Sequence, residues 1–460
     1  MTELFGEYDL CVAGAGVTGL VAAVSAAREG ASVLLLEAGP AIGGMLTLGR
    51  MTSATGSVHG GIYRELLQSV ERNGGGNAKA RYFHGAQQTG LWDPAAMRKA
   101  VLALVHSAGI DALLHASVTD VLRQGALLRG LFLQVKGGQR LVLAQTVIDA
   151  TGDADVAALA GAALQIGREA DGLSQPMSSY VRVLNVDMPA LAKYAKENAG
   201  DFSLVDVPEP LPEHNEGYAG SLRIAGFDKQ IEHARSQGFE WTPPRDKMLM
   251  KAGMIPGEVN LNVTCVNGNP LDERARTRAE FEVERQAYVA VDFLRQFVPG
   301  FANAVLLEVA PRLGVRESRR ILGEHVMSAD EVRNEARFED AIGLSECPID
   351  VHDPLSQQIW VEAVGSGYGI PFRALMPRGV DGLLAAGRCA SADHVAMGSL
   401  RNTPACALMG EAAGVAAALA ARQCTTVGKL SVTDIQQVLK QRGIRLGTPE
   451  ISEEIKKEKV

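Results

Sequence analysis

The sequence has few of the features that mark metal-binding, disulfide-bonded or nucleic-acid-binding proteins. Its six cysteines lie far apart, and none of them forms a CxxC pair or has the Cys/His spacing of a zinc site. They predict no metal site and no disulfide framework, and we expect most of them to be small core residues. The net charge of −8 without a basic block disfavours nucleic-acid binding, because backbone phosphates require clustered Lys and Arg.

Long apolar runs are also scarce. The run at residues 410–421 contains Glu411 and is shorter than the ~20 residues that cross a bilayer, so it predicts a buried helix. No signal-peptide pattern precedes Tyr8, because the apolar residues 9–14 begin a strand. With 47% hydrophobic residues among 460, we expect a cytoplasmic globular protein of one to three domains without an integral membrane segment.

Residues 9–37 carry the pattern of a nucleotide-binding βαβ unit. An apolar strand at 9–13 is followed by G-A-G-V-T-G at 14–19, an Ala-rich helix pattern, and a second strand that ends at Glu37. Glycines in this turn let a pyrophosphate approach the helix N-terminus, and the acid can bind ribose hydroxyls. The candidate residues are Gly14, Ala15, Gly16, Val17, Thr18, Gly19, Glu37 and Ala38. This motif alone leaves NAD and FAD open.

The following segments favour FAD. Gly43 and Gly44, with Met45, can bring backbone against a ligand that extends past the second strand. Strand-like segments with glycine turns then run from residue 112 to an A-T-G-D turn at 150–153. A β-meander inserted into a Rossmann unit and closed by such a turn resembles the two-glycine-motif FAD-binding fold.

A wider resemblance covers almost the whole chain. The matching segments include GAGVTGLVAAVSAAREGASVLLLEAGPAIGG, HGGIYREL, VIDATGDADVAALAGA, GVRESRRILGEHVMSADEV, GIPFRALMP and LLAAGRCASADHVAMGSLRNTPACALMGEAAG. They resemble the FAD-dependent oxidoreductase family and, more distantly, the flavoprotein subunits of succinate dehydrogenase and fumarate reductase. The resemblance implies an α/β fold, in which a Rossmann-like FAD-binding domain with a β-meander is interrupted by an inserted α+β substrate domain. We expect the limits 1–163, 164–360 and 361–460.

The resemblance also implies roles for individual residues. The three motif glycines would hold the FAD pyrophosphate, Glu37 the adenosine ribose and Val118 the adenine, while the Gly-Gly pair would run along the flavin side. The nucleotide end would be closed by Ala150, Thr151, Gly152 and Asp153. The ribityl chain and the ring would meet Gly387, Arg388 and a helix start that contains Ser399, Arg401, Pro404 and Ala405. The last assignment also has a physical basis, because a helix N-terminus favours the anionic reduced flavin.

The expected FAD linkage is non-covalent. In the succinate dehydrogenase group the flavin is often attached to a His upstream of Gly-Gly-Ile, and this chain has Gly60-Gly61-Ile62. Six positions before Gly60, however, stands Ala54, and His59 lies directly beside the glycines. His59 is therefore the residue that would contradict the expectation.

Five residues are candidates for catalysis. Arg316 and Arg319 lie in an Arg-rich block beside apolar segments, where they could clamp a carboxylate or belong to a structural ion-pair network. His394 precedes the helix expected at the flavin and could act as general acid or base, or be a satisfied core residue. Tyr368 and Arg373 could contact the substrate, or serve as an anchoring hydrogen bond and a surface Arg.

These features predict a flavoenzyme that transfers a hydride between a small, anionic organic substrate and flavin N5. His394 or Tyr368 would handle the proton. Only one G-x-G-x-x-G is present, whereas a second Rossmann domain for NAD(P)H would need another. The electron partner would therefore be a diffusing carrier, a quinone, O2 or a redox protein. Homo-oligomers are compatible with the sequence. Two alternatives are open: an oxygenase or oxidase that uses O2, and an electron-relay flavoprotein without an organic substrate.

Overall fold

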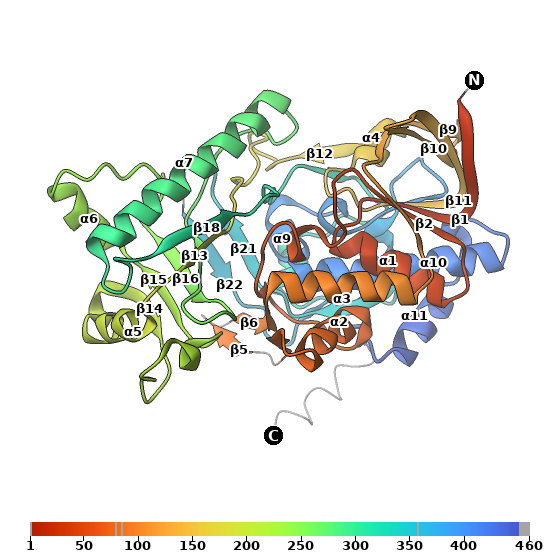
Figure 1. Cartoon of the computed structure of the whole chain (residues 1–460). Coiled ribbons are helices and arrows are strands. Elements are labelled where there is room, and N and C mark those ends of the chain that lie inside the picture. The colour runs from red at the N-terminus through yellow and green to blue at the C-terminus, as the bar shows by residue number, and fades with distance from the viewer. Residues whose placement is uncertain (1, 79–80, 84–85, 357, 450–460) are drawn as a thin grey trace.

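The computed structural model describes residues 2–78, 81–83, 86–356 and 358–449. They form two lobes that lie side by side in Figure 1. One lobe contains both ends of the described chain and a largely parallel sheet, whereas the other contains an antiparallel sheet from the middle of the chain. The chain therefore leaves the first lobe to build the second and then returns.

The first lobe is built on a seven-stranded sheet. Its order is β8 (Asp111–Leu114), β2 (Val33–Glu37), β1 (Glu3–Ala13), β11 (Gly138–Asp149), β10 (Leu127–Val135) and β9 (Ser117–Gln124), and β24 (Leu383–Ala385) also pairs with β11. Strands β8, β2, β1, β11 and β24 are parallel, whereas β9, β10 and β11 form an antiparallel meander. The predicted Rossmann-like α/β fold with a β-meander is confirmed.

Two helices pack closely beside this sheet. They are α1 (Val17–Arg28), which follows the first glycine turn, and α10 (Thr403–Arg422) near the C-terminus (Figure 1). A Cβ added at Gly410 would lie 2.2 Å from Thr18 O, and one at Gly414 would lie 2.2 Å from Ala22 O. Small residues therefore let the two backbones touch.

The second helix is long and apolar enough to cross a membrane, but 94% of its apolar window is buried inside the protein. The predicted buried helix is thus confirmed.

The second lobe contains a six-stranded antiparallel sheet. Its order is β14 (Phe202–Asp206), β15 (Arg223–Gly226), β16 (Met248–Ala252), β17 (Val259–Asn262), β13 (Val181–Leu184) and β18 (Val305–Val309). One face is apolar, because the paired residues Ile224, Met250, Leu261 and Val181 point to the same side. Those residues share a core with α5 (Met188–Glu197), α6 (Asp228–Ser236) and α7 (Glu273–Phe297). Helix α7 is amphipathic, because its buried residues Ala279, Val283, Ala287 and Val291 recur at helical spacing among charged residues.

The core of this lobe extends from Val181 to Ala304, whereas buried residues from Met327 to Val364 belong to the core of the first lobe. The limits 164 and 360 stay predictions.

The remaining α-helices are α2 (Gly61–Arg72), α3 (Pro94–Ser107), α4 (Asp155–Leu159), α8 (Ala329–Arg333), α9 (His394–Leu400) and α11 (Val432–Gln441). The remaining paired strands are β3 (Ala54–Thr55), β6 (Ala86–Thr89) and β5 (Arg81–Phe83); β4 (Gly76–Asn77) and β7 (Leu91–Trp92); β12 (Leu164–Ile166) and β19 (Arg319–Ile321); β20 (Ala341–Ser345) and β23 (Tyr368–Pro371); and β21 (Ile349–His352) and β22 (Ile359–Glu362).

Candidate active site

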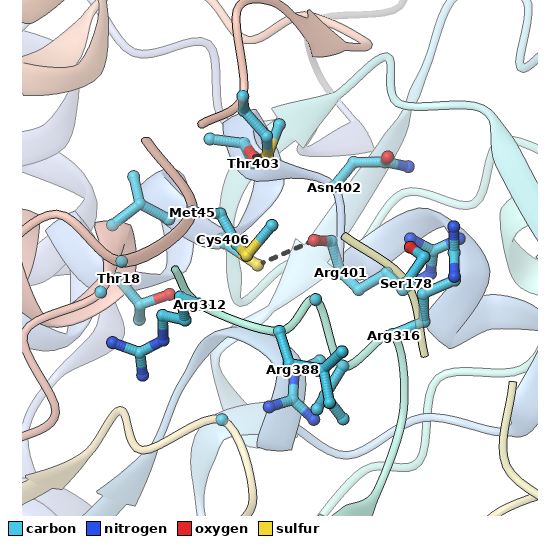
Figure 2. Close-up of a pocket in the computed structure, with 18 of the residues that line it drawn as sticks. Thr18, Met45, Ser178, Arg312, Arg316, Arg388, Arg401, Asn402, Thr403 and Cys406 are labelled. Atoms are coloured by element: carbon cyan, nitrogen blue, oxygen red, sulfur yellow. Dashed lines mark hydrogen bonds between the residues drawn. The ribbon is translucent and has the colours of Figure 1, made fainter. Parts of the chain in front are cut away.

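A cavity of about 270 Å³ is lined by residues from both lobes. Its walls are the first glycine turn, the A-T-G-D turn after β11, the start of α10 and the polar face of the second sheet. Figure 2 shows Thr18 and Arg312 toward one side, and Ser178, Arg316 and Arg401 toward the other. Segments that lie far apart in the sequence therefore form one site.

Glycine is needed at the three motif positions for different structural reasons. Gly14 has φ +94°, and a Cβ there would lie 2.5 Å from Ala150 O. A Cβ at Gly19 would lie 1.8 Å from Gly14 O, so the third glycine is required for close packing. Gly16, in contrast, lines the cavity, and a Cβ there would meet no heavy atom within 4 Å. The open space at the middle glycine fits a ligand that approaches the backbone closely.

The Gly-Gly pair supports this turn from outside. The Gly43 N–H donates to Ala15 O at 2.7 Å, and a Cβ at Gly44 would lie 3.0 Å from Gly16 Cα. The Glu37 carboxylate accepts the N–H groups of Ala15 at 3.0 Å and Gly39 at 2.9 Å. It also lies 3.2 Å from an Arg312 nitrogen.

The returning segment meets the first turn through Gly387 and Arg388. Gly387 has φ +81°, and a Cβ there would lie 2.3 Å from Thr18 Oγ1. Arg388 forms an ion pair with Asp153 at 2.8 Å. Burial raises the pKa of Asp153, but the Arg388 charge and the Ser318 hydrogen bond together hold it below its usual value.

The helix that meets the cavity begins later than the sequence suggested. Ser399 lies in α9, where its hydroxyl contacts Tyr368 Oη at 2.6 Å and donates to Cys347 O at 2.5 Å. The longer helix α10 begins at Thr403, because Asn402 has an extended backbone and Pro404 suits a first helical turn. The Asn402 side chain does not cap this helix but donates to carbonyls of the preceding segments.

Twelve of the predicted cofactor residues line the cavity, and ten do not. The lining residues are Gly14, Gly16, Val17, Thr18, Gly44, Met45, Ala150, Thr151, Gly152, Asp153, Arg388 and Arg401. The others are Ala15, Gly19, Glu37, Ala38, Gly43, Val118, Gly387, Ser399, Pro404 and Ala405. Several of these, including Ala15, Gly19 and Gly43, support the lining residues from behind.

Of the five candidate catalytic residues, only Arg316 lines the cavity. Arg319 binds Asp155 at 2.5 Å and Asp153 O at 2.7 Å, and His394 Nδ1 lies 2.9 Å from the buried Glu317 carboxylate. Arg373, whose side chain is 50% exposed, pairs with Asp340 at 3.0 Å. These contacts, with the Tyr368–Ser399 bond, match the structural alternatives for the four residues, whose catalytic roles stay predictions.

Arg316 belongs to a cluster of three guanidinium groups, of which Arg245 is buried and Arg316 and Arg401 are partly buried. Arg401 donates to Asp350 O at 2.5 Å, and Arg245 lies 3.0 Å from Nδ1 of His352. Burial and the charges of Arg245 and Arg401 lower the pKa of Arg316 to about 10, so it stays charged at neutral pH.

The two other ionisable groups of the cluster balance only part of this charge. Burial and the nearby Arg316 lower the pKa of His352 to about 3, so its imidazole is neutral at neutral pH. Burial alone would raise the pKa of Asp350, but His352, Arg401 and Arg316 lower it below its ordinary value. The three guanidiniums therefore face one carboxylate.

Several cavity residues were not identified from the sequence. They are Lys251 and Asn262 of the second sheet, Tyr180 directly before β13, and Asp350 of β21. They belong to no motif, but residues 259–263 alternate between apolar residues and Asn. That period of two is the available signal for a strand with a polar face.

The comparison with known families decides the class of this site. The family model described as FAD dependent oxidoreductase matches residues 9–439. The chain belongs to this family. FAD is therefore the cofactor of this oxidoreductase, and the open space at Gly16 together with the glycine-lined turn fits such a dinucleotide.

No curated protein matches the flavoprotein. Solved structures similar to it include a geranylgeranyl bacteriochlorophyll reductase-like protein from Thermoplasma acidophilum, with 13% identity, a TM-score of 0.45, and 95% of this chain and 84% of that chain covered. Another is p-nitrophenol 4-monooxygenase from Pseudomonas putida, with 12% identity, a TM-score of 0.42, and coverages of 96% and 85%. Likenesses this distant say nothing of the reaction or the substrate of the oxidoreductase.

Proposed function

We propose that the FAD pyrophosphate lies over Gly14 and Gly16 at the start of α1, and that the ring lies toward Met45 and the start of α10. The open backbone at Gly16 supports the first placement. The second is supported by the first turn of α10, whose N-terminus carries partial positive charge and lines the cavity through Thr403 and Cys406. When bound, FAD supplies a two-electron acceptor or donor.

We further propose that the enzyme transfers a hydride between the flavin and a small, anionic organic substrate. The observation that carries this proposal is the charge of the cavity, which is lined by six cationic side chains and two carboxylates. The cationic residues are Lys251, Arg276, Arg312, Arg316, Arg388 and Arg401. The pyrophosphate offsets only part of their charge, and Arg316 and Arg401 lie toward the side opposite Thr18 and Arg312 (Figure 2).

Buried cations require a partner. The Nε atoms of Arg245 and Arg401 and the Nε2 atom of Gln175 are buried without a hydrogen-bond partner among the described residues. Leaving such groups unpaired costs about 1–3 kcal/mol each. An Arg guanidinium can bind a carboxylate through two parallel hydrogen bonds. A substrate carboxylate between Arg316 and Arg401 would thus neutralise part of the excess positive charge of the cavity.

Anaerobic bleaching of the flavin tests this assignment. We expect a hydroxy acid that bleaches the wild type to do so about 10- to 100-fold less effectively in an Arg316→Gln variant, because a charge-assisted hydrogen bond is lost. The amide of the same acid should be a poor reductant of both proteins. Arg333→Gln is the matched control, since Arg333 pairs with Glu362 and does not line the cavity. Equal bleaching by acid and amide in all three proteins would contradict the anionic substrate.

A further inference from the structure

The polar face of the second sheet carries a continuous row of charged and amide side chains. Lys251 on β16 pairs with Arg223 on β15 and with Asn260 on β17, and Asn260 pairs in turn with Arg182 on β13. Directly paired residues point to the same side of a sheet, so the row faces away from the apolar core of the lobe. Lys251 Nζ donates to Ser53 Oγ of the FAD-binding lobe at 2.9 Å, and both residues line the cavity.

Unlike Arg182 and Arg388, Lys251 has no acidic partner among the described residues. Arg182 is paired with Glu258 and Glu308, each at 2.7 Å, and Arg388 with Asp153 at 2.8 Å. Lys251 is 8% exposed and is the only lysine among the buried side chains of the described residues. Within that part of the chain it forms no ion pair, and its one recorded hydrogen bond is to an uncharged hydroxyl.

The surroundings of Lys251 disfavour its charged form. Arg223 lies directly opposite Lys251 on β15. On the other side, the neutral Asn260 separates Lys251 from Arg182. The acidic partners of Arg182 are Glu258, Glu308 and, at 3.8 Å, Asp93. Burial and the Arg223 charge lower the pKa of Lys251 from 10.5 to about 7. The Asn260 amide, 2% exposed, has no hydrogen-bond partner among the described residues. It can therefore form hydrogen bonds with a ligand that lies beside the amine.

Other groups at the cavity are poorly suited to proton transfer. His352 is engaged through both ring nitrogens, at 3.0 Å by Arg245 and at 3.2 Å by Asp350. Tyr180 lines the cavity, but burial raises the pKa of its phenol, so it keeps its proton. His394 and Tyr368, the residues expected from the sequence, lie outside the lining.

We propose that Lys251 is the acid–base residue of this oxidoreductase. As the substrate C–H bond breaks and its electron pair leaves with hydrogen as hydride to the flavin, the hydroxyl or amino group on the same carbon gives its proton to the neutral Lys251 Nζ. The substrate gains a C=O or C=N bond, FAD is reduced by two electrons, and the neutral amine becomes an ammonium. In the reverse reaction the ammonium returns the proton. This assignment rests on the proposed hydride transfer.

The first test is independent of any substrate. Competitive labelling of lysines with acetic anhydride across pH, followed by peptide mass spectrometry of the FAD-loaded protein, measures the titration of the Lys251 amine. We expect its labelling to follow a midpoint near pH 7, and a midpoint near pH 10 would overturn the proposal. Anions that enter the cavity, tested with malonate, should slow the labelling of Lys251 but not that of the exposed Lys247.

The second test uses a compound that bleaches the wild type. The rate of flavin reduction should rise with pH through about 7 and then level off, because the neutral amine accepts the proton. Lys251→Met should lower this rate about 100-fold or more and remove the pH dependence, and methylamine should partly restore the rate in Lys251→Ala. Lys247→Met is the matched control.

The outcomes separate the two proposals. Unchanged reduction and an unchanged pH profile in Lys251→Met would overturn the role of Lys251 but leave hydride transfer intact. Failure of every organic compound to bleach the wild type would overturn both.

Discussion

At the scale of the residue, the cavity is lined by cations whose charged forms are destabilised by burial. Lys251 illustrates the effect on folding, because its pKa is about 7 in the folded protein and 10.5 ordinarily. Between these values the unfolded chain binds one more proton, so stability rises with pH across this window. Below pH 7 the full penalty applies, which amounts to about 5 kcal/mol at most.

We therefore predict that Lys251→Met is more stable than the wild type at about pH 6, and that the difference shrinks toward pH 10. Thermal unfolding across pH measures this. Lys247→Met should show no such trend, because Lys247 is exposed. A difference between Lys251→Met and the wild type that is the same at every pH would show that the methionine acts by packing and not by removing a buried charge.

Two glycines of the first turn separate ligand binding from folding. Gly16→Ala should fold normally, since its Cβ meets no atom within 4 Å and its φ of −64° suits alanine. It should nevertheless bind FAD at least about 10-fold more weakly, because the methyl group enters the pyrophosphate site. Fluorescence titration of the apoprotein with FAD gives the affinity, and wild-type affinity would exclude this placement of the cofactor.

Gly19→Ala supplies the contrast. Its Cβ would overlap Gly14 O at 1.8 Å, so the variant should lose thermal stability as well as FAD. The role of this turn in nucleotide binding was predictable from the sequence, since each glycine falls in a local motif. Lys251 and Asp350 were not, because their position depends on strand pairing with residues elsewhere in the chain.

At the scale of the element, the contact between α1 and α10 joins the two halves of the FAD-binding lobe. Gly414→Ala should lower the free energy of unfolding by about 1–3 kcal/mol, because the added methyl would lie 2.2 Å from Ala22 O and force the helices apart. Denaturant unfolding measures the loss. Gly200→Ala is the control, because a Cβ there meets no atom within 4 Å. Equal stability of the two variants would contradict the backbone contact.

The same segment shows what local patterns reveal about elements. The glycine turn at Gly387 and the long buried helix that follows it were predictable from local patterns. The interruption at Arg401 and Asn402 was not predicted. It arises from the extended backbone of Asn402, whose amide donates to the carbonyls of Pro348, Gly398 and Ser399. Only the first of these bonds joins a distant segment, and sequence spacing does not reveal it.

At the scale of the whole molecule, the cavity is lined by segments from near both ends of the chain and from its middle. The fold of the FAD-binding lobe was predictable because nucleotide binding imposes glycines at fixed spacing. The second lobe was predictable only as an α+β insertion, since its polar face results from pairing among strands that span residues 181–309. The cytoplasmic location, the electron partner and the oligomeric state stay predictions.

Non-covalent binding of FAD is also testable on the whole protein. His59 Nε2 lies 3.0 Å from Glu346 Oε1, and His59 does not line the cavity. Acid precipitation of the yellow holoprotein should therefore release FAD into the supernatant. A His59→Ala variant should retain its FAD in the same way, and a flavin that stays with the precipitated wild-type protein would contradict the expectation.

The central claim is that an organic substrate reduces the flavin within this cavity. The most direct measurement adds carboxylates, hydroxy acids and amines, and separately NAD(P)H, to the oxidised holoprotein under strictly anaerobic conditions while the flavin absorbance is followed. Our account predicts that at least one of the organic compounds bleaches the flavin and is itself oxidised by two electrons, whereas NAD(P)H does not bleach it. Bleaching by NAD(P)H alone would contradict the account and favour an oxygenase or a reductase.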